Sequence, residues 1–365
     1  MNSYKKIKLS DFVYMNPSER LPKGTIARKI SMDQIELYKK FVFSTNYEQY
    51  SGGAKFRNGD TIMARITPCL ENGKTAFVSG LAENEIAFGS TEYIVLRAKE
   101  NISIPDFVYY LTISSIIREP AIKSMVGSSG RQRVQQSVLD ELEIPLFSIA
   151  DQQHIVDILG SIDDKIENNG KIIENLEQFA IAEYQKITKE ADSFICLGDV
   201  IDIFDSKRKP LSSREREAKK GSYRYFGATG VLDYVNNYLF DGEYVLLAED
   251  GTVIDAEGFP IVQLVTGQFW INNHAHIMQA KSNYTNYSLY VALKRLQVKE
   301  AVTGAVQLKI NQANLCALEL PYITPDVLLG YNNMIEPMFK KIIHIRNENE
   351  VLNKLKQLYL QKFFG

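Results

Sequence analysis

Residues 151–190 read DQQHIVDILGSIDDKIENNGKIIENLEQFAIAEYQKITKE, a stretch without proline. Its apolar residues recur at alternating steps of four and three, as do the a and d positions of a coiled coil. The seam positions we assign are Ile155, Leu159, Ile162, Ile166, Asn169, Ile173 and Leu176, continued by Ala180 and Ile187. Ser148 or Asp151 can cap its start. A helix of about 40 residues is roughly 60 Å long, and so narrow a seam predicts packing against a second long helix.

The C-terminal residues 326–363 supply such a helix. Its seam positions are Met338, Ile342, Ile345, Asn349, Leu352 and Tyr359, with Lys356 expected to interrupt them. Each helix thus has one polar seam residue, Asn169 or Asn349, and a buried Asn can fix the register of a coiled coil. Residues 151–190 contain nine acidic and four basic residues, and residues 326–363 contain four and six. We expect the two helices to pack antiparallel within one chain; the alternative is two unrelated surface helices.

The composition is that of an ordinary globular protein, with 365 residues, 24% charged residues and a net charge of −2. The three cysteines, Cys69, Cys196 and Cys316, are scattered without zinc spacing, which indicates a reducing cytoplasm. The N-terminus has no apolar core of signal-peptide length, and no apolar run is long enough to span a bilayer. We therefore expect a cytoplasmic protein that does not contact the membrane. Any nucleic-acid contact must depend on local positive charge.

The sequence repeats itself before each long helix. MVGSSGRQRVQQSVLDELEIP (125–145) matches AVTGAVQLKINQANLCALELP (301–321) without a gap, at the offset of 176 residues that separates Pro145 from Pro321. Upstream, FRNGDTIMARI (56–66) resembles FDGEYVLLAED (240–250) at a larger offset, which implies a small insertion in the second copy.

Strand-like runs at 61–66, 75–79 and 92–98 and a helical run at 106–118 make each globular part mixed. We predict an α/β (α+β) fold with two similar domains, residues 1–147 and 192–325. A long antiparallel two-helix coiled coil, formed by residues 148–191 and 326–365, is expected to separate them, with pseudo-two-fold symmetry.

Duplex DNA has its own two-fold symmetry, so two domains on a rigid spacer suit two separated half-sites. Arg, Lys, Ser and Gln side chains in turns can reach phosphates or base edges. In the first domain the candidate DNA-binding residues are Lys55, Arg57, Arg65, Lys74, Ser128, Ser129, Arg131, Gln132 and Arg133. In the second domain they are Lys207, Arg208, Lys209, Arg214, Arg216, Lys219, Lys220, Tyr223, Tyr225, Thr229, Asn273, His274, His276, Gln307 and Lys309. For any one of these side chains, simple solvation is at least as common a role.

Other roles were weighed for the histidines and aromatic residues of the second domain. His274 and His276 would share a face of a strand and could bind a metal, but no third ligand is evident, so packing or DNA contact is favoured and no metal is predicted. Trp270 and the tyrosines of residues 223–244 could stack on a flipped base, although core filling is the commoner role.

Several motifs together resemble one known family, the specificity subunits of type I restriction–modification systems. DQQHIVDILGSIDDKIENNGKIIENLEQFA resembles their central conserved helix. GDTIMARITPCLENGKTAFV resembles a motif of one class of their target-recognition domains, and YRYFGATGVLDYVNNYLFDGEYVLLAEDG and WINNHAH resemble motifs of another class. The resemblance implies two target-recognition domains that read a bipartite double-stranded DNA site. It also implies conserved helices that dock two modification subunits, which use S-adenosylmethionine to methylate adenine at N6, and a restriction (translocase) subunit that can join them.

The chain itself has no catalytic motif that rises above chance. It lacks an Asn-Pro-Pro-Tyr or Asp-Pro-Pro-Tyr segment and a phosphate-binding Gly-rich loop, and FGATG (226–230) alone is weak evidence for a cofactor. We therefore expect a non-catalytic subunit without a cofactor of its own. Two alternatives remain open: a fragment of a fused restriction–methylation enzyme, and a coiled-coil adaptor without a nucleic-acid role.

Overall fold

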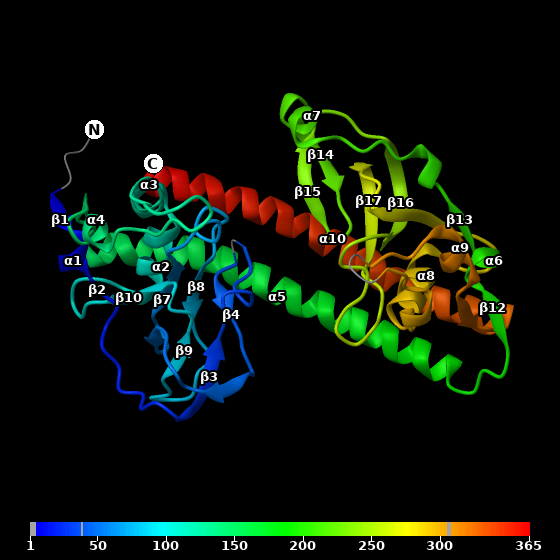
Figure 1. Cartoon of the computed structure of the whole chain (residues 1–365), viewed down its shortest axis with the longest axis horizontal. Helices are drawn as coiled ribbons and strands as arrows, with labels where there is room; N and C mark the ends of the chain where they lie inside the picture. Colours follow the sequence, from blue (N-terminus) through cyan, green and yellow to red (C-terminus); the bar gives the residue numbers. More distant parts are fainter. Residues whose placement is uncertain (1–4, 38, 305–307) are drawn as a thin grey trace. The chain divides into compact units, whose positions relative to one another are not determined.

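A computed structural model of the chain describes residues 5–37, 39–304 and 308–365. The chain divides into two compact units, one of residues 1–168 and 349–365 and the other of residues 169–348 (Figure 1). Each unit contains one globular domain and a part of both long helices, α5 (Ile149–Thr188) and α10 (Pro325–Phe364). None of the described helices is long and apolar enough to cross a lipid bilayer.

The first unit contains two main sheets, one of five strands in the order β2-β10-β7-β8-β4 and one of four in the order β5-β3-β9-β6; β1 and β11 form a separate pair. Its strands are β1 (Lys6–Lys8), β2 (Val13–Met15), β3 (Ile26–Ile30), β4 (Phe41–Val42), β5 (Tyr47–Gln49), β6 (Lys55–Phe56), β7 (Thr61–Ala64), β8 (Thr75–Val78), β9 (Ala87–Gly89), β10 (Tyr93–Ala98) and β11 (Glu143–Pro145). Its shorter helices are α1 (Leu9–Phe12), α2 (Pro105–Ile113), α3 (Ser115–Lys123) and α4 (Gln136–Asp140).

Alternation along β10 explains how its sheet acquires two buried faces. Ile94 and Leu96 belong to a core that includes α2 and reaches Leu159 of α5 and Leu360 of α10, whereas Val95 belongs to the core toward the four-stranded sheet. The helix expected over residues 106–118 is interrupted, because Ser114 adopts an extended conformation between α2 and α3.

The second unit is built around a six-stranded sheet in the order β13-β18-β16-β17-β14-β15, together with a β12–β19 pair. Its strands are β12 (Phe194–Cys196), β13 (Ile201–Ile203), β14 (Lys220–Phe226), β15 (Val231–Val235), β16 (Phe240–Ala248), β17 (Val262–Ile271), β18 (Ala275–Ala280) and β19 (Glu319–Pro321). Its helical elements are α6 (Leu197–Val200), η1 (Asp205–Lys207), α7 (Ser213–Ala218), α8 (Asn286–Lys294), η2 (Lys299–Ala301) and α9 (Gln312–Ala317). Helix α8 shares a core with the parts of α5 and α10 in this unit.

The predicted repeat is confirmed, because the two domains share a strand order and a set of backbone hydrogen bonds. The antiparallel series β2-β10-β7-β8 corresponds to β13-β18-β16-β17, and a parallel strand follows in each, β4 or β14. The amide of Val134 donates to the carbonyl of Arg65 (2.9 Å), and that of Ile310 donates to Glu249 (2.9 Å). Arg65 and Glu249 therefore occupy equivalent positions, each just after the central strand of its sheet.

In the first unit α5 and α10 run antiparallel. The rings of His154 and Phe363 lie 6.1 Å apart, and further along the Nζ of Lys356 lies 2.6 Å from the Oδ1 of Asp163. The predicted seam residues Ile155, Leu159 and Ile162 are buried, while Ile166, Asn349, Leu352 and Tyr359 are half-buried. Lys356 does not interrupt the packing as expected: it is 2% exposed and its ammonium is paired.

The same two helices also run antiparallel within the second unit. Asn169 donates from Nδ2 to Glu348 Oε2 (2.8 Å), and the hydroxyl of Tyr331 donates to the carbonyl of Ala180 (2.8 Å). Of the predicted seam residues here, Asn169, Ile342 and Ile345 are buried, and Ile173, Leu176 and Met338 are half-buried. The two long helices predicted from the heptad pattern are confirmed.

Candidate nucleic-acid interface

The glycine-rich segment of residues 126–133 forms a loop between α3 and α4. Val126 and Arg133 pair as a β-bridge that closes it, and Gly127 has a φ of 137°, where a Cβ would lie 2.9 Å from the carbonyl oxygen of Arg131. The predicted residues Ser128, Ser129 and Arg131 are exposed on this loop. Half-buried Gln132 accepts from the amide of Thr67 (3.0 Å) through its carbonyl, which ties the loop to the end of the central strand.

Arg133, at the base of this loop, forms an ion pair. Its Nη2 lies 2.7 Å from Glu92 Oε1, and the hydrogen bond and charge of Glu92 raise the pKa of the guanidinium. Arg133 also bridges to Ile66, directly after Arg65. The loop of residues 126–133 is therefore joined to both the segment after the central strand and the turn before β10.

Lys55 and Arg65, two of the predicted residues, line one groove of about 450 Å³. Lys55 donates to the carbonyl of Glu19, and Arg65 donates from Nη2 to the carbonyl of Val134 at 3.3 Å. Arg57 is largely exposed, with its Nε 3.9 Å from Glu19 Oε1. Lys74 is not in this groove: its Nζ donates to the carbonyl of Met32 (2.6 Å).

The second domain has a corresponding segment before α9. Thr303 and Lys309 form the closing β-bridge, and Lys309 also bridges to Asp250, as Arg133 does to Ile66 in the first domain. The Nζ of Lys309 lies 3.2 Å from Glu249 Oε1. Gln307, another predicted residue, lies outside the described residues.

Glu249 is the centre of a charged cluster in the second domain. Arg208 lies 2.7 Å from it, and His276 contacts Asp205 through Nδ1 (2.6 Å) and the carbonyl of Ile310 through Nε2 (2.8 Å). Burial tends to raise the pKa of the Glu249 and Asp205 carboxyls. Hydrogen bonds from neighbouring side chains outweigh it, from Arg208 to Glu249 and from His276 to Asp205, so the pKa of each carboxyl lies below its ordinary value.

The ligand atoms of Asp205, Glu249 and His276 lie within 4.8 Å of one another, which raises the question of a metal. Both ring nitrogens of His276 already contact oxygen atoms, and Arg208 and Lys309 already balance Glu249. The geometry therefore fits an ion-pair network better than a metal site. His274 does not converge on this cluster, because its Nδ1 contacts Asp250 at 2.6 Å.

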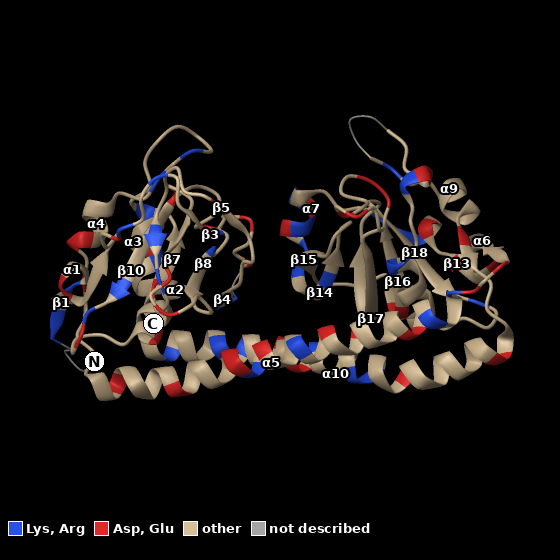
Figure 2. Cartoon of the chain, turned by 90° about the horizontal axis from the view of Figure 1, so that it is seen from below, with Lys and Arg blue, Asp and Glu red and all other residues tan. Residues whose placement is uncertain are grey.

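Part of the positive charge of segment 206–224 is balanced by contacts within its own domain. Arg216 and Lys220 both contact Asp233, at 3.0 Å each, and basic and acidic positions are interleaved around α7 and its neighbouring strands (Figure 2). Lys207 and Lys219 lie over the rings of Phe204 and Trp270, at 4.9 and 5.6 Å.

Other side chains of this domain divide into exposed and buried groups. Of the remaining predicted residues, Lys209, Arg214, Thr229 and Asn273 have exposed side chains. Tyr225 and Trp270 are buried, and the indole of Trp270 donates to the carbonyl of Lys209 (2.6 Å), as expected of core aromatic residues. Tyr223 is half-buried and packs on Tyr238.

A comparison with known protein families identifies both domains. The model of the type I restriction modification DNA specificity domain matches residues 3–178 and again residues 191–324, which together are most of the chain. This chain belongs to the type I restriction–modification DNA specificity family. The two globular domains are thus two specificity domains, each followed by one of the long helices.

Relatives of this family resemble the chain over different lengths. The HindI specificity subunit of Haemophilus influenzae is 30% identical over 193 residues, which are 51% of this chain and 40% of that protein. The MjaIX specificity subunit of Methanocaldococcus jannaschii is 24% identical over 301 residues, 72% of this chain and 69% of that protein. Another Haemophilus influenzae relative matches over only 37% of its own length.

Among solved structures, a type I restriction–modification system S subunit from M. genitalium has the same fold. Its TM-score is 0.55 at 17% sequence identity, with 100% of this chain and 97% of that chain covered.

The acidic partners of the specificity domains were missed by sequence reasoning. Glu92, Asp233 and Glu249 each hold predicted DNA-binding cations. One signal was available: FRNGDTIMARI and FDGEYVLLAED place Arg65 opposite Glu249, a reversal of charge within otherwise similar strands. No comparable signal in the sequence indicated the role of Asp205, which lies far from Glu249 along the chain.

Proposed function

We propose that this chain is the DNA-specificity subunit of a type I restriction–modification complex, in which each specificity domain reads one half of a bipartite site. The observation that carries this proposal is the presence of two specificity domains in one chain with the same strand order. In each domain an isolated β-bridge, Val126–Arg133 or Thr303–Lys309, is joined by a second bridge to the residues just after the central strand. Two related DNA-binding domains in one chain suit a DNA site with two separated parts.

Exposed polar side chains of both domains have the chemistry that DNA contact requires. Ser128, Ser129 and Arg131 are exposed in the first domain, and Thr229, Asn273 and Arg214 are exposed in the second. Hydroxyl, amide and guanidinium groups bind phosphates and base edges alike. Because most other cations are paired internally, strong binding would depend on an assembled complex that adds its own positive charge.

An exposed apolar stripe on each long helix supports the docking of partner subunits. On α10 in the first unit, Val351, Leu355 and Leu358 follow one helical face and are 64%, 38% and 62% exposed. On α5 in the second unit, Ile172 and Phe179 are 41% and 45% exposed. Leu355 and Phe179 are separated by the 176 residues of the repeat. One exposed apolar stripe on each long helix suits two copies of one partner, for which we propose the modification subunits.

In this proposal the chain reads DNA and catalyses nothing. The modification subunits bind S-adenosylmethionine and methylate adenine, the paired helices set the distance between the two half-sites, and a restriction (translocase) subunit joins the same complex. The absence of a methyltransferase motif from the sequence supports this division of roles.

Methylation of a random-sequence DNA library tests the proposal. Modification subunits with this chain should methylate adenines within one bipartite motif, and modification subunits alone should methylate none. Methylation or cleavage by the isolated chain would support the alternative of a fused-enzyme fragment. Sequence-independent binding by the full complex would support the adaptor alternative.

A further inference from the structure

Arg65 has hydrogen-bonding capacity that its own domain does not use. A guanidinium has five N–H donors. Arg65 makes one 3.3 Å contact from Nη2 to the carbonyl of Val134, and its Nε is buried without a partner among the described residues. Glu92, a nearby carboxylate, is already held by Arg133. A buried donor without an acceptor is unfavourable, so an external acceptor would stabilise this side chain.

The space beside Arg65 is large enough for part of a DNA strand. The groove of about 450 Å³ has Lys55 and Arg65 as the charged residues of its lining. Neither Asp nor Glu is among these lining residues, so the groove favours a ligand rich in hydrogen-bond acceptors. It lies next to the loop of residues 126–133, because the carbonyl of Arg65 accepts from Val134 at the end of that loop.

The second domain fills the equivalent position with its own charges. Glu249 stands where Arg65 stands in the first domain, and it is contacted by Arg208 at 2.7 Å and Lys309 at 3.2 Å. Its carboxylate is therefore satisfied within the domain. The same backbone position is thus open to a ligand in one domain and closed in the other.

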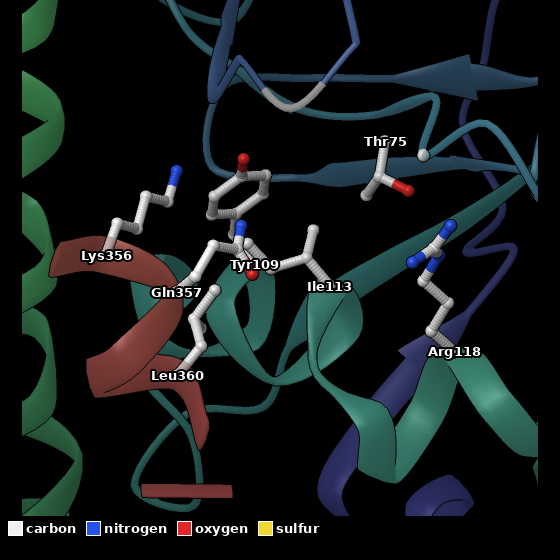
Figure 3. A pocket seen from close by; sticks show the side chains of 8 residues that line it. Thr75, Tyr109, Ile113, Arg118, Lys356, Gln357 and Leu360 are labelled. Atoms are coloured by element: carbon white, nitrogen blue, oxygen red, sulfur yellow. The ribbon is translucent and has the colours of Figure 1, made fainter. Parts of the chain in front are cut away.

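Another arginine of the first domain shows what Arg65 would look like without a binding role. Arg118 also donates from Nη2 to a backbone carbonyl, that of Glu71, and its Nε is also buried without a partner among the described residues. Arg118 lines an enclosed cavity of only about 50 Å³, covered by Lys356, Gln357 and Leu360 of α10 (Figure 3). That volume holds a few water molecules, not a nucleotide.

We infer that Arg65 binds a pair of hydrogen-bond acceptors of the bound DNA in this groove. The acceptors are the O6 and N7 of a guanine or two oxygens of one phosphate, because both match the planar guanidinium fork. Lys55 at the same groove adds positive charge without a fixed geometry. This inference rests on the proposed function of the chain as a DNA-specificity subunit.

The test uses the full complex of this chain with its modification subunits and a DNA library randomised at every position. Arg65→Gln removes the charge and the fork, and Arg65→Lys keeps the charge but loses the fork. Arg118→Gln is the matched control, since it removes the same group from an enclosed site in the same domain. Methylated motifs are sequenced, and affinity for the wild-type site is measured at several salt concentrations.

A guanine contact predicts that Arg65→Gln and Arg65→Lys relax one position of one half-site by about ten- to a hundred-fold, while the other half-site is unchanged. A phosphate contact predicts an unchanged motif, a uniform loss of affinity and a salt slope reduced by about 1 for Arg65→Gln. Either result supports the inference. An Arg65→Gln complex that matches Arg118→Gln in motif, affinity and salt slope would overturn it, while a wild-type complex without a bipartite motif would instead overturn the proposed function.

Discussion

The central strand of the first specificity domain is followed by Arg65, and that of the second is followed by Glu249. The backbone around these residues is alike, since each amide donates to the turn before the next strand, at Glu92 (2.9 Å) or His274 (2.8 Å). The side chains differ completely: the guanidinium has unused donors, and the carboxylate is surrounded by cations. The repeated hydrogen bonds therefore define a common fold, while the side chains at the strand ends differ between the two domains.

The packing of the two long helices shows a similar difference between equivalent positions. Asp163 and Lys356 form a buried ion pair in the first unit, and the residues 176 positions away, Phe339 and Ala180, are both buried and apolar in the second. Equivalent buried positions are thus occupied by an ion pair in the first unit and by apolar side chains in the second. In the second unit Glu177 of α5 pairs with Arg346 of α10 at 2.8 Å instead.

The largest expected effect comes from breaking the buried pair of the first unit. Lys356→Met leaves the Asp163 carboxylate buried without its cation and should lower the free energy of unfolding by about 3–5 kcal/mol. Adding Asp163→Leu should recover only part of that loss, because it removes the unpaired charge but also the acceptor of the Tyr110 hydroxyl (2.8 Å). Denaturant unfolding measures both. Lys340→Met, which removes an exposed pair with Glu336, is the control and should change stability by less than about 1 kcal/mol. Equal losses for Lys356→Met and the control would refute this role.

Loss of its acidic residue should destabilise the charged cluster of the second domain more than the corresponding loss destabilises the ion pair of the first domain. Glu249→Ala removes the acceptor of Arg208 and Lys309 and should reduce the free energy of unfolding by about 2–3 kcal/mol. Glu92→Ala breaks the more exposed pair with Arg133 and should reduce it by at most about 1 kcal/mol. If chemical denaturation gave the opposite order, the description of Glu249 as an internal counter-charge would be wrong.

A fall in pH should also destabilise the charged cluster of the second domain. The folded-state pKa values of Asp205 and Glu249 lie below their ordinary values of 3.8 and 4.5, so the unfolded chain takes up protons first as the pH falls. The stability that these carboxylates contribute is present above pH 4.5 and is lost as the pH falls through the lower folded values. Melting temperatures between pH 6 and pH 3 should fall less for an Asp205→Asn, Glu249→Gln variant than for the wild type. Parallel curves would contradict the assignment.

The smallest effect on stability is expected at the exposed arginines, Arg131 in the first domain and Arg214 in the second. Replacement of either by Ala should change the free energy of unfolding by less than about 0.5 kcal/mol. If each contacts a phosphate, the salt slope of DNA binding by the assembled complex should decrease by about 1 per residue. Fluorescence anisotropy at several salt concentrations measures the slope, and a slope unchanged in both variants would remove these residues from the interface.

The sequence was informative where a pattern repeats over many residues. Heptads predicted α5 and α10, and the gapless match that ends at Pro145 and Pro321 predicted the common topology, because such signals depend on local spacing. The pattern did not reveal that Lys356 is buried, since its partner Asp163 is distant in sequence. For the same reason the internal roles of Arg208 and Arg216 in the basic segment were not predicted: a run of positive charge does not show where its counter-charges lie.

Exchange of one specificity domain is the most direct test of whether the two domains recognise DNA independently. The first specificity domain, residues 1–147, is replaced by that of another family member, and the motif methylated by the complex is sequenced. We expect one half of the bipartite motif to change, while the other half and the spacing between them stay the same. A motif altered in both halves, or unaltered in both, would contradict it.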